Sequence, residues 1–479
     1  MDNKLLNKIV HVFFGAALIQ GANIILYMVL ARLMPTEAFA TYRQLFLIQA
    51  IVSAMSFSAI PTALLYFCNA SKSMRVKWNY IKSICILVLL LGLVIAMVIF
   101  FARETIALAF SNIKLAESLK VFAFVPLATM FVSMLASVFI VIDKTAIQIK
   151  VAGFIAIVKV VPVIVVAFVY NNFQAILWST VLTHIVVGLF SALLIRYLGK
   201  CYPFKPTVFR LFIPRLCLYS FPLLLASSAS ILGLKIDHLI VSSLLGTTIY
   251  ALYTVGAFEI PIFSLIQSSI SAVLIPQITR DIKNKDYIQA QTLWKTVSYK
   301  SALLSFPIAI LFIVEAEYIV TLLFSEKYRA ASPIFALFSS LAVIRVMAFG
   351  LGLRAMGKTN IEFYCTLFYL VSSGIGAYFF TKHLGMHGAA IWVVINTIAY
   401  IILLALVTAK VSEYNLNLWQ IYPVKLLLMA FFMLFIVWCL RLKNANEHLC
   451  FIMSLAEIII FWCFGAMLLD KNRLKKNNR

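Results

Sequence analysis

The stretch Ser227–Pro261, SSASILGLKIDHLIVSSLLGTTIYALYTVGAFEIP, combines long apolar runs with charges placed inside them. Lys235, Asp237 and His238 lie in one apolar run, and Glu259 lies in the next. A charge at the centre of a membrane helix costs about 2.5–3.5 kcal/mol on insertion scales, so such residues usually face a cavity and mark a pathway. We therefore expect these four side chains to face a polar interior.

The composition is that of a polytopic membrane protein. Hydrophobic residues make up 63% of the 479 residues, charged residues only 12%, and the mean hydropathy is +1.02, which lies far outside the range of soluble proteins. The formal net charge of +23 does not indicate a nucleic-acid partner, because cytoplasmic loops of membrane proteins collect Lys and Arg for topological reasons. The eight cysteines form no C-x-x-C pair, so neither a zinc site nor a redox motif is expected.

A spanning helix needs about 20 largely apolar residues, and dividing the sequence at its charged and Pro/Gly-rich breaks predicts about fourteen of them. The predicted spans are 9–33, 41–68, 81–101, 119–142, 149–170, 175–197, 217–245, 249–277, 299–323, 331–353, 361–381, 387–409, 422–441 and 448–469. With a cytoplasmic N-terminus, about 26 of the 40 Lys and Arg residues fall on the cytoplasmic side and about 8 on the other, as the positive-inside rule requires. Both termini are therefore expected in the cytoplasm.

The two halves of the chain carry a weak internal repeat. A shift of 211 residues aligns Leu33 with Leu244, Thr36 with Thr247, Ala40 with Ala251, Tyr42 with Tyr253 and Ser53 with Ser264. Because Met34 and Pro35 end the first helix, Leu245 and Gly246 should end the seventh. Lys235 and Asp237 then lie about eight to ten residues before that helix end, well inside the membrane.

The first helix carries Gln20 and Asn23 at about the same depth, so both halves are expected to present polar groups to a shared interior. The repeat predicts an all-α membrane protein with two six-helix lobes, 1–200 and 201–410, followed by two further helices and a basic cytoplasmic tail in 411–479.

Four stretches occur in an order that is typical of one family. They are VLARLMPTEAFATYRQLF, PRLCLYSFPLLLASS, YIVTLLFSEKYRAASPIFALFSSLAVIRVMAFGLGLRAMGKTN and HLGMHGAAIWVVINTIAY. The succession resembles polysaccharide and oligosaccharide-lipid flippases of the multidrug/oligosaccharidyl-lipid/polysaccharide exporter superfamily, although Pro35 and Ala40 stand where that family often has Gly.

The resemblance implies two lobes around a central cavity that opens alternately to each side of the bacterial cytoplasmic membrane. Its substrate would be an undecaprenyl-pyrophosphate-linked oligosaccharide for O-antigen, capsule or a related surface polysaccharide. Membrane lipids and a polysaccharide polymerase are the partners that it implies. No cofactor, metal or nucleic acid is expected.

Five basic residues are candidates for contact with such an anionic substrate. Lys159, Lys235 and Arg345 lie near the middle of predicted spans, where a structural ion pair is the alternative. Arg32 and Arg43 bracket the outer turn between the first two helices, where snorkelling to the interface explains them as well.

Asp237 and Glu259 are the acids predicted to face the second-lobe interior. They either pair with Lys235 or bind a coupling proton or cation, and the sequence leaves both open. His238 is either a hydrogen-bonded wall residue or a proton relay.

Two other transport functions fit the same plan, namely a multidrug/cation antiporter and a flippase for a lipid-linked peptidoglycan precursor. A carrier of organic cations should show acids in mid-span, and the predicted spans 9–33, 41–68 and 149–170 carry none there. An enzyme would need a sizeable loop or domain, but the two longest cytoplasmic links are only about 20 residues each. We therefore expect a non-enzymatic transporter.

Overall fold

The computed structural model describes residues 3–258, 263, 277–282, 284–345, 350–412, 423–443, 454, 456, 458–459 and 461–462. Throughout these ranges the regular structure is helical, without a strand. The chain divides into two compact units, Met1–Ala251 and Leu252–Arg479.

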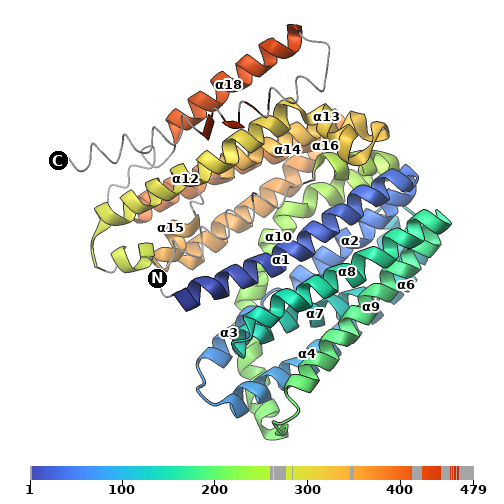
Figure 1. The fold of residues 1–479 in the computed structure, drawn as a ribbon, viewed down its shortest axis with the longest axis vertical. Coiled ribbons are helices and arrows are strands. Elements are labelled where there is room, and N and C mark those ends of the chain that lie inside the picture. The colour runs from blue at the N-terminus through green and yellow to red at the C-terminus, as the bar shows by residue number, and fades with distance from the viewer. Residues whose placement is uncertain are drawn as a thin grey trace. The chain divides into compact units, whose positions relative to one another are not determined.

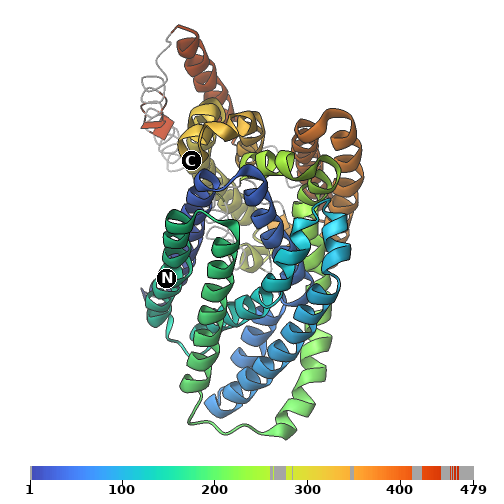
Figure 2. The same ribbon diagram turned by 90° about the vertical axis from the view of Figure 1, so that its right-hand side faces the viewer.

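Unit 1 consists of nine helices and most of a tenth within its described residues (Figure 1). They are α1 (Asn3–Leu33), α2 (Thr36–Ser56), α3 (Ile60–Asn69), α4 (Met74–Phe101), α5 (Arg103–Ala109), α6 (Lys114–Phe122), α7 (Val125–Val141), α8 (Thr145–Tyr170), α9 (Phe173–Leu198) and α10 (Pro206–Gly256). Helix α1 packs along α8, which packs along α9, and α9 packs along α7 (Figures 1 and 2). These four helices surround the site described below.

Unit 2 holds the helices from α12 onward. They are α12 (Tyr287–Val314), α13 (Ala316–Phe324), the 3-10 helix η1 (Glu326–Ala331), α14 (Ser332–Ile344), α15 (Gly350–Ala355), α16 (Thr359–Val411) and α18 (Val424–Lys443). Helix α12 packs on α14 and α18, and α14 packs on α16. At the end of α15, the Arg354 Nε donates to both carboxylate oxygens of Glu362 at 2.9 Å, and these hydrogen bonds raise the pKa of the guanidinium.

Two long helices contain a break that the sequence predicts. Gly246 in α10 has φ +76°, a backbone conformation that L side chains rarely adopt, and it lies where the repeat places the end of the seventh helix. Gly385 in α16 has φ +60° and separates the predicted spans 361–381 and 387–409. The backbone therefore changes direction at glycines that interrupt long apolar runs.

Prolines occupy two kinds of position in the described helices. Pro162 and Pro307 lie inside α8 and α12, and Pro222 lies inside α10. Pro61 and Pro126 instead lie in the first turns of α3 and α7, where the missing amide hydrogen costs no helical hydrogen bond. Pro261 lies outside the described residues.

The backbone extends the internal repeat beyond the sequence identities. Three residues with positive φ in unit 1 each have a counterpart with positive φ in unit 2 at a constant spacing of 214 residues, three more than the shift of 211 that aligns the sequences around the first helix. The pairs are Ser111 and Ser325, Asp143 and Gly357, and Asn171 and Gly385. In the sequence-aligned pairs, Ala40, Tyr42, Ala251 and Tyr253 are all fully buried. The two halves therefore share their helix breaks as well as their helix order.

The helices are long and apolar enough for a multi-pass membrane protein. Among the described residues, eight helices pass this test, and α6 with α7 forms a ninth span bent by 45°. Two of the eight, Phe209–Gly256 and Thr359–Val411, contain the glycine breaks described above. The total of about fourteen stays a prediction, because 249–277, 422–441 and 448–469 fall partly or largely outside the described residues.

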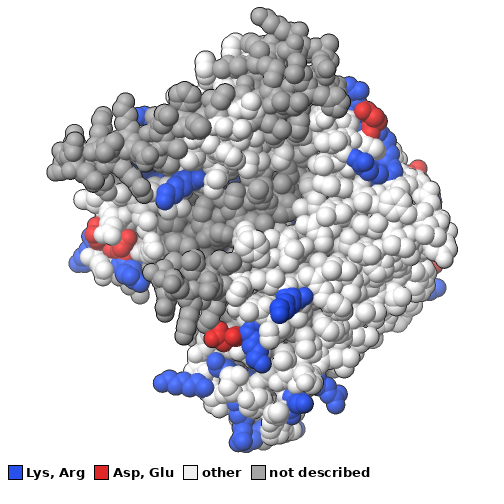
Figure 3. Space-filling model, in the orientation of Figure 1, with Lys and Arg blue, Asp and Glu red and all other residues white. Residues whose placement is uncertain are grey.

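Charged side chains avoid the long apolar faces of unit 1. In Figure 3 the surface over α8 and α9 is almost entirely white, whereas Lys and Arg gather around the loops that join α3 to α4 and α9 to α10. This is the distribution that a surrounding bilayer requires.

Close helix packing in unit 1 can be tested at Gly188 of α9. A Cβ there would lie 2.7 Å from the Cα of Ala128 on α7, so Gly188→Ala must push two helices apart and should destabilise the protein by about 1–3 kcal/mol. In α8, a Cβ at Gly153 would meet no atom within 4 Å, and Gly153→Ala should be neutral or stabilising. The thermal unfolding midpoint of the purified protein measures both, and equal midpoints would contradict the packing described here.

Candidate functional site

A cavity of about 420 Å³ lies inside unit 1, between α1, α7, α8 and α9. Small residues line part of this space. They are Gly15 and Ala16 on α1 and Ala152 on α8. Much of the wall is apolar. The polar side chains that line it are Gln20, Thr129, Ser133, Ser137, Gln148, Lys159 and His184.

Lys159 is the charged residue among those that line the cavity, and no Asp or Glu lines it. The residue lies near the middle of α8, which runs from Thr145 to Tyr170. Its side chain is partly buried and makes no hydrogen bond or ion pair within the described part of the chain. A cation at this depth needs an anion, a hydroxyl or water to replace its lost hydration.

His184 lies on α9 and lines the same cavity as Lys159, and the residue is only 4% exposed. Its Nδ1 lies 2.7 Å from the carbonyl oxygen of Thr180. Because a carbonyl oxygen can only accept, Nδ1 carries the proton, and the Nε2 of the neutral ring is then an acceptor. That Nε2 is buried and has no hydrogen-bond partner among the described residues.

Gln148 supplies a second acceptor from the first turn of α8. The residue is 8% exposed, and its Oε1 is buried without a partner in the described chain. The cavity therefore combines one cationic donor with two unpartnered acceptors, a mixed polarity within a largely apolar wall.

A second polar cluster joins α2 to α10, away from this cavity. The guanidinium carbon of Arg43 lies 4.4 Å from the ring centroid of Tyr27. On α10, Asp237 and His238 are buried, and the charges of Lys235 and Arg43 lie close enough to act on the His238 ring. The structure thus brings Arg43, Lys235 and His238 near one another, as part of a packed cluster.

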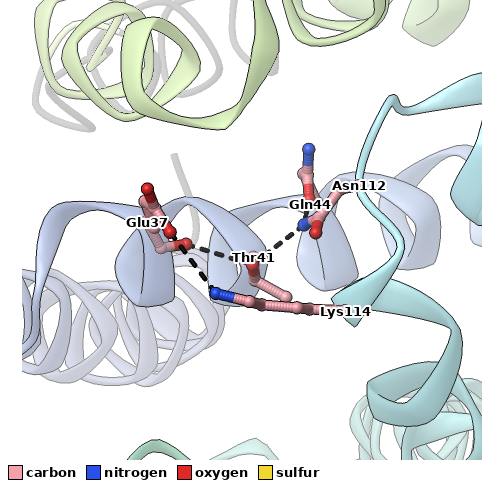
Figure 4. A network of polar contacts seen from close by, with 5 residues as sticks. All are labelled: Glu37, Thr41, Gln44, Asn112 and Lys114. Carbon is pink, nitrogen blue, oxygen red and sulfur yellow. Dashed lines mark hydrogen bonds and ion pairs between the residues drawn. The ribbon is translucent and has the colours of Figure 1, made fainter.

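A hydrogen-bond network lies beside this cluster (Figure 4). The Asn112 Nδ2 donates to Thr41 Oγ1 at 2.9 Å and to Gln44 Oε1 at 2.6 Å. The Gln44 Nε2 in turn donates to Ser242 Oγ on α10 at 2.7 Å. All four side chains are buried. The network therefore links α2, the turn before α6 and α10 through hydrogen bonds between buried polar groups.

An ion pair extends this network to the surface. The Lys114 Nζ lies 3.4 Å from Glu37 Oε2, and both side chains are largely exposed (Figure 4). Exposed pairs of this kind contribute little to stability. The buried amide contacts are therefore the stronger link between these helices.

The predicted site residues do not all lie in one site. Lys159 and Gln20 line the cavity, whereas Lys235, Asp237, His238, Arg43 and Asn23 do not. The remaining three are Arg32, exposed near the end of α1, Arg345, at the C-terminus of α14 in unit 2, and Glu259, outside the described residues.

Several buried polar residues were not predicted from the sequence, among them His184, Gln148 and Glu315. His184 and Gln148 line the cavity, and the run Thr180, Thr183, His184 on one face of an apolar helix was the signal for the first. In unit 2, Glu315 is 1% exposed and accepts a hydrogen bond from Ser454 Oγ at 2.9 Å. Its place between α12 and α13 gave no pattern that distinguished it from a loop acid.

The repeat counterpart of Lys159 is Ser373 on α16, 214 residues later. There the polar groups are satisfied by each other, since Asn396 Nδ2 donates to Ser373 Oγ at 2.7 Å and Asn396 Oδ1 accepts from Ser372 Oγ at 2.7 Å. At this position, unit 2 has a serine–asparagine hydrogen-bond network, whereas unit 1 has a lysine that lines a cavity.

A family model identifies the family of the chain, and solved structures share its fold. The family model described as polysaccharide biosynthesis protein matches residues 29–333. Among solved structures, the lipid II flippase MurJ in an inward closed conformation has a TM-score of 0.76 at 16% identity, covering 98% of this chain and 100% of that one.

Two further structures share the fold at lower similarity. An inward-facing multidrug resistance MATE transporter of the MOP superfamily has a TM-score of 0.60 at 15% identity, covering 82% of this chain and 96% of that one. A MOP superfamily transporter from Pyrococcus furiosus, described as having a binding pocket of reverse polarity, has a TM-score of 0.61 at 15% identity, covering 85% and 95%. No curated protein matches the sequence.

The cavity should admit a small water-soluble thiol reagent. Ser133 on α7 is exposed and lines the cavity, whereas Ser83 on α4 is fully buried and does not. Ser133→Cys should therefore react at least about 10-fold faster than Ser83→Cys, because a buried thiol forms its reactive thiolate poorly. The added adduct, measured by intact mass against the parent protein, reports each rate. Equal rates would show that the cavity is closed to water.

Proposed function

Because the chain belongs to the polysaccharide biosynthesis protein family, we propose that it flips undecaprenyl-pyrophosphate-linked oligosaccharide units across the cytoplasmic membrane. These units would serve O-antigen, capsule or a related surface polysaccharide. The lipid tail can stay in the bilayer during transfer, so the protein has to shelter only the polar head group. A multi-pass helical transporter fold without a large extramembrane domain fits this task.

The observation that carries the proposal is the unpaired Lys159 in the unit 1 cavity. An anionic or hydroxyl-rich substrate compensates this cation, whereas an organic cation would be repelled by it. The absence of Asp and Glu from the cavity lining disfavours the multidrug/cation antiporter, although the MATE transporters share the fold.

The fold of the lipid II flippase MurJ supports a lipid-linked substrate. That substrate class leaves two candidates, a surface-polysaccharide unit and a peptidoglycan precursor. The family match over residues 29–333 favours the surface polysaccharide.

The proposal includes an arrangement in the membrane. Two six-helix lobes, 1–200 and 201–410, would alternate access to a cavity in the cytoplasmic membrane, with 411–479 as additional helices and both termini in the cytoplasm. Lys159, Lys235, Arg345, Arg32 and Arg43 would contact the pyrophosphate or the glycan of the head group, and a polysaccharide polymerase would receive the flipped unit. The excess of Lys and Arg on one side of the predicted spans supports this orientation.

Substitution of the cavity cation tests the function directly. Lys159→Ala should lower translocation of the lipid-linked oligosaccharide in reconstituted vesicles by about 10- to 100-fold, since a hydrogen bond to a charged group contributes about 1.5–3 kcal/mol. Surface glycan display at single-copy expression should fall without a fall in protein level. The matched control is Lys382→Ala, at an exposed lysine of α16. Unchanged translocation by Lys159→Ala would refute the role of the cationic cavity.

Coupling to a proton or cation is proposed for Asp237, a buried acid on α10, and for Glu259. Asp237→Asn keeps the size of the side chain and removes its negative charge, so transport should lose its dependence on an imposed ion gradient. Glu104→Gln, at an acid whose side chain is 77% exposed, should leave that dependence unchanged. Vesicle transport with and without the gradient measures both variants. Full gradient dependence in Asp237→Asn and in Glu259→Gln would exclude these acids as the coupling sites.

A further inference from the structure

We propose that the unit 1 cavity binds a sugar ring of the glycan, and that the pyrophosphate of the same substrate is held elsewhere. This inference rests on the proposed function and adds to it which part of the substrate occupies the cavity. It follows from the hydrogen-bonding character of Lys159, His184 and Gln148, which line the cavity together.

The first step is the direction of the His184 hydrogen bonds. The Thr180 carbonyl accepts from Nδ1 at 2.7 Å, so Nε2 presents a lone pair. The side chain is 4% exposed, and Nε2 has no partner among the described residues. A buried acceptor without a donor costs about 1–3 kcal/mol, so the site favours a ligand that donates.

The second step is that Gln148 also presents a buried acceptor without a donor. Its Oε1 is a buried acceptor without a partner in the described chain, on a residue that is 8% exposed. Two buried acceptors without a partner and one cationic donor therefore line one cavity, together with the Gln20 amide and the hydroxyls of Thr129, Ser133 and Ser137, which can donate or accept. The ligand has to donate at two points and accept at a third.

A pyrophosphate does not meet this requirement. Its oxygens are acceptors that carry more than one negative charge, so they would face the two lone pairs of His184 and Gln148 while Lys159 alone supplied a positive charge. Phosphate sites are normally built from several donors, such as backbone amides and arginines. The unit 1 cavity has one cation and no arginine, and its two unpartnered acceptors would face the phosphate oxygens.

A sugar ring can donate hydrogen bonds at two points and accept one at a third. Each hydroxyl both donates and accepts, so two hydroxyls can donate to His184 Nε2 and Gln148 Oε1 while a third accepts from Lys159. The apolar lining, which includes Val12, Ile19, Ile155 and Val187, suits the C–H faces of the ring. The volume of about 420 Å³ lies in the range of small-ligand pockets.

The test uses the full-length Ser133→Cys protein in detergent, where both sides are accessible. One probe is the repeat-unit oligosaccharide released from the host's own surface polysaccharide, free of lipid and phosphate. The other is undecaprenyl pyrophosphate without sugar. The oligosaccharide should slow labelling of Cys at position 133 with increasing concentration, and undecaprenyl pyrophosphate should not.

Substitution of the acceptors sharpens the test. In this background, His184→Phe and Gln148→Leu should each raise the oligosaccharide concentration for half-protection by about 3- to 10-fold, the effect of one lost hydrogen bond. His184→Gln, which keeps an acceptor at the end of a side chain of similar reach, should recover part of the loss. The same change at the exposed His383 of α16, His383→Phe, is the matched control.

Several results would overturn the inference. They are protection by undecaprenyl pyrophosphate and not by the oligosaccharide, no protection by either probe, or unchanged half-protection in both acceptor variants. If His184→Phe does not fold, as judged by its unfolding midpoint, the inference is tested by the half-protection concentrations of Gln148→Leu and His184→Gln. Failure of the proposed function is read separately, because it appears as absent vesicle translocation by the unsubstituted protein, whereas the labelling assay requires no transport.

Discussion

Polar side chains within a membrane protein have to find their partners inside the protein, because the hydrocarbon of the bilayer offers none. Most of the described polar contacts in this chain obey that constraint. Asn112, Gln44 and Ser242 satisfy one another across three segments of unit 1, and Asn396 satisfies two serines of α16 in unit 2. Of the buried side-chain atoms that lack a partner among the described residues, those of His184 and Gln148 are the two whose residues line the unit 1 cavity.

The internal repeat shows how the two halves have diverged. Their backbones share the positive φ residues at a spacing of 214, as in Asn171 and Gly385. Their polar chemistry does not follow the backbone, since Lys159 corresponds to Ser373 in a network closed by Asn396. The unit 1 copy of the helix pair lines a cavity, whereas the unit 2 copy has a serine–asparagine network at the position that corresponds to Lys159.

The sequence predicts much of the fold because membrane helices are dictated by local composition. Apolar length locates the spans, and the aligned breaks place the end of the seventh helix at Gly246, where the structure has φ +76°. The cavity is harder to predict. Lys159 and Gln20 were identifiable as polar residues at depth, but the acceptor on His184 depends on a hydrogen bond to Thr180 and on the packing of α1, α7, α8 and α9, neither of which is encoded in spacing. For the same reason, the charges at Lys235, Asp237 and His238 predicted a polar interior beside α10, whereas the cavity lies among α1, α7, α8 and α9.

The uncompensated Lys159 also has an electrical consequence. In its charged form it gives the empty cavity a positive charge that no lining carboxylate neutralises. Any rearrangement that carries this side chain along the membrane normal moves that charge through the transmembrane voltage, which is worth about 2.3 kcal/mol per elementary charge for a full crossing at 100 mV. A neutral ligand would leave this voltage sensitivity in place during loaded movement, whereas an anionic ligand would cancel it. The resting voltage of the cell thus acts on the empty and the loaded protein to different extents, according to the charge of what it carries.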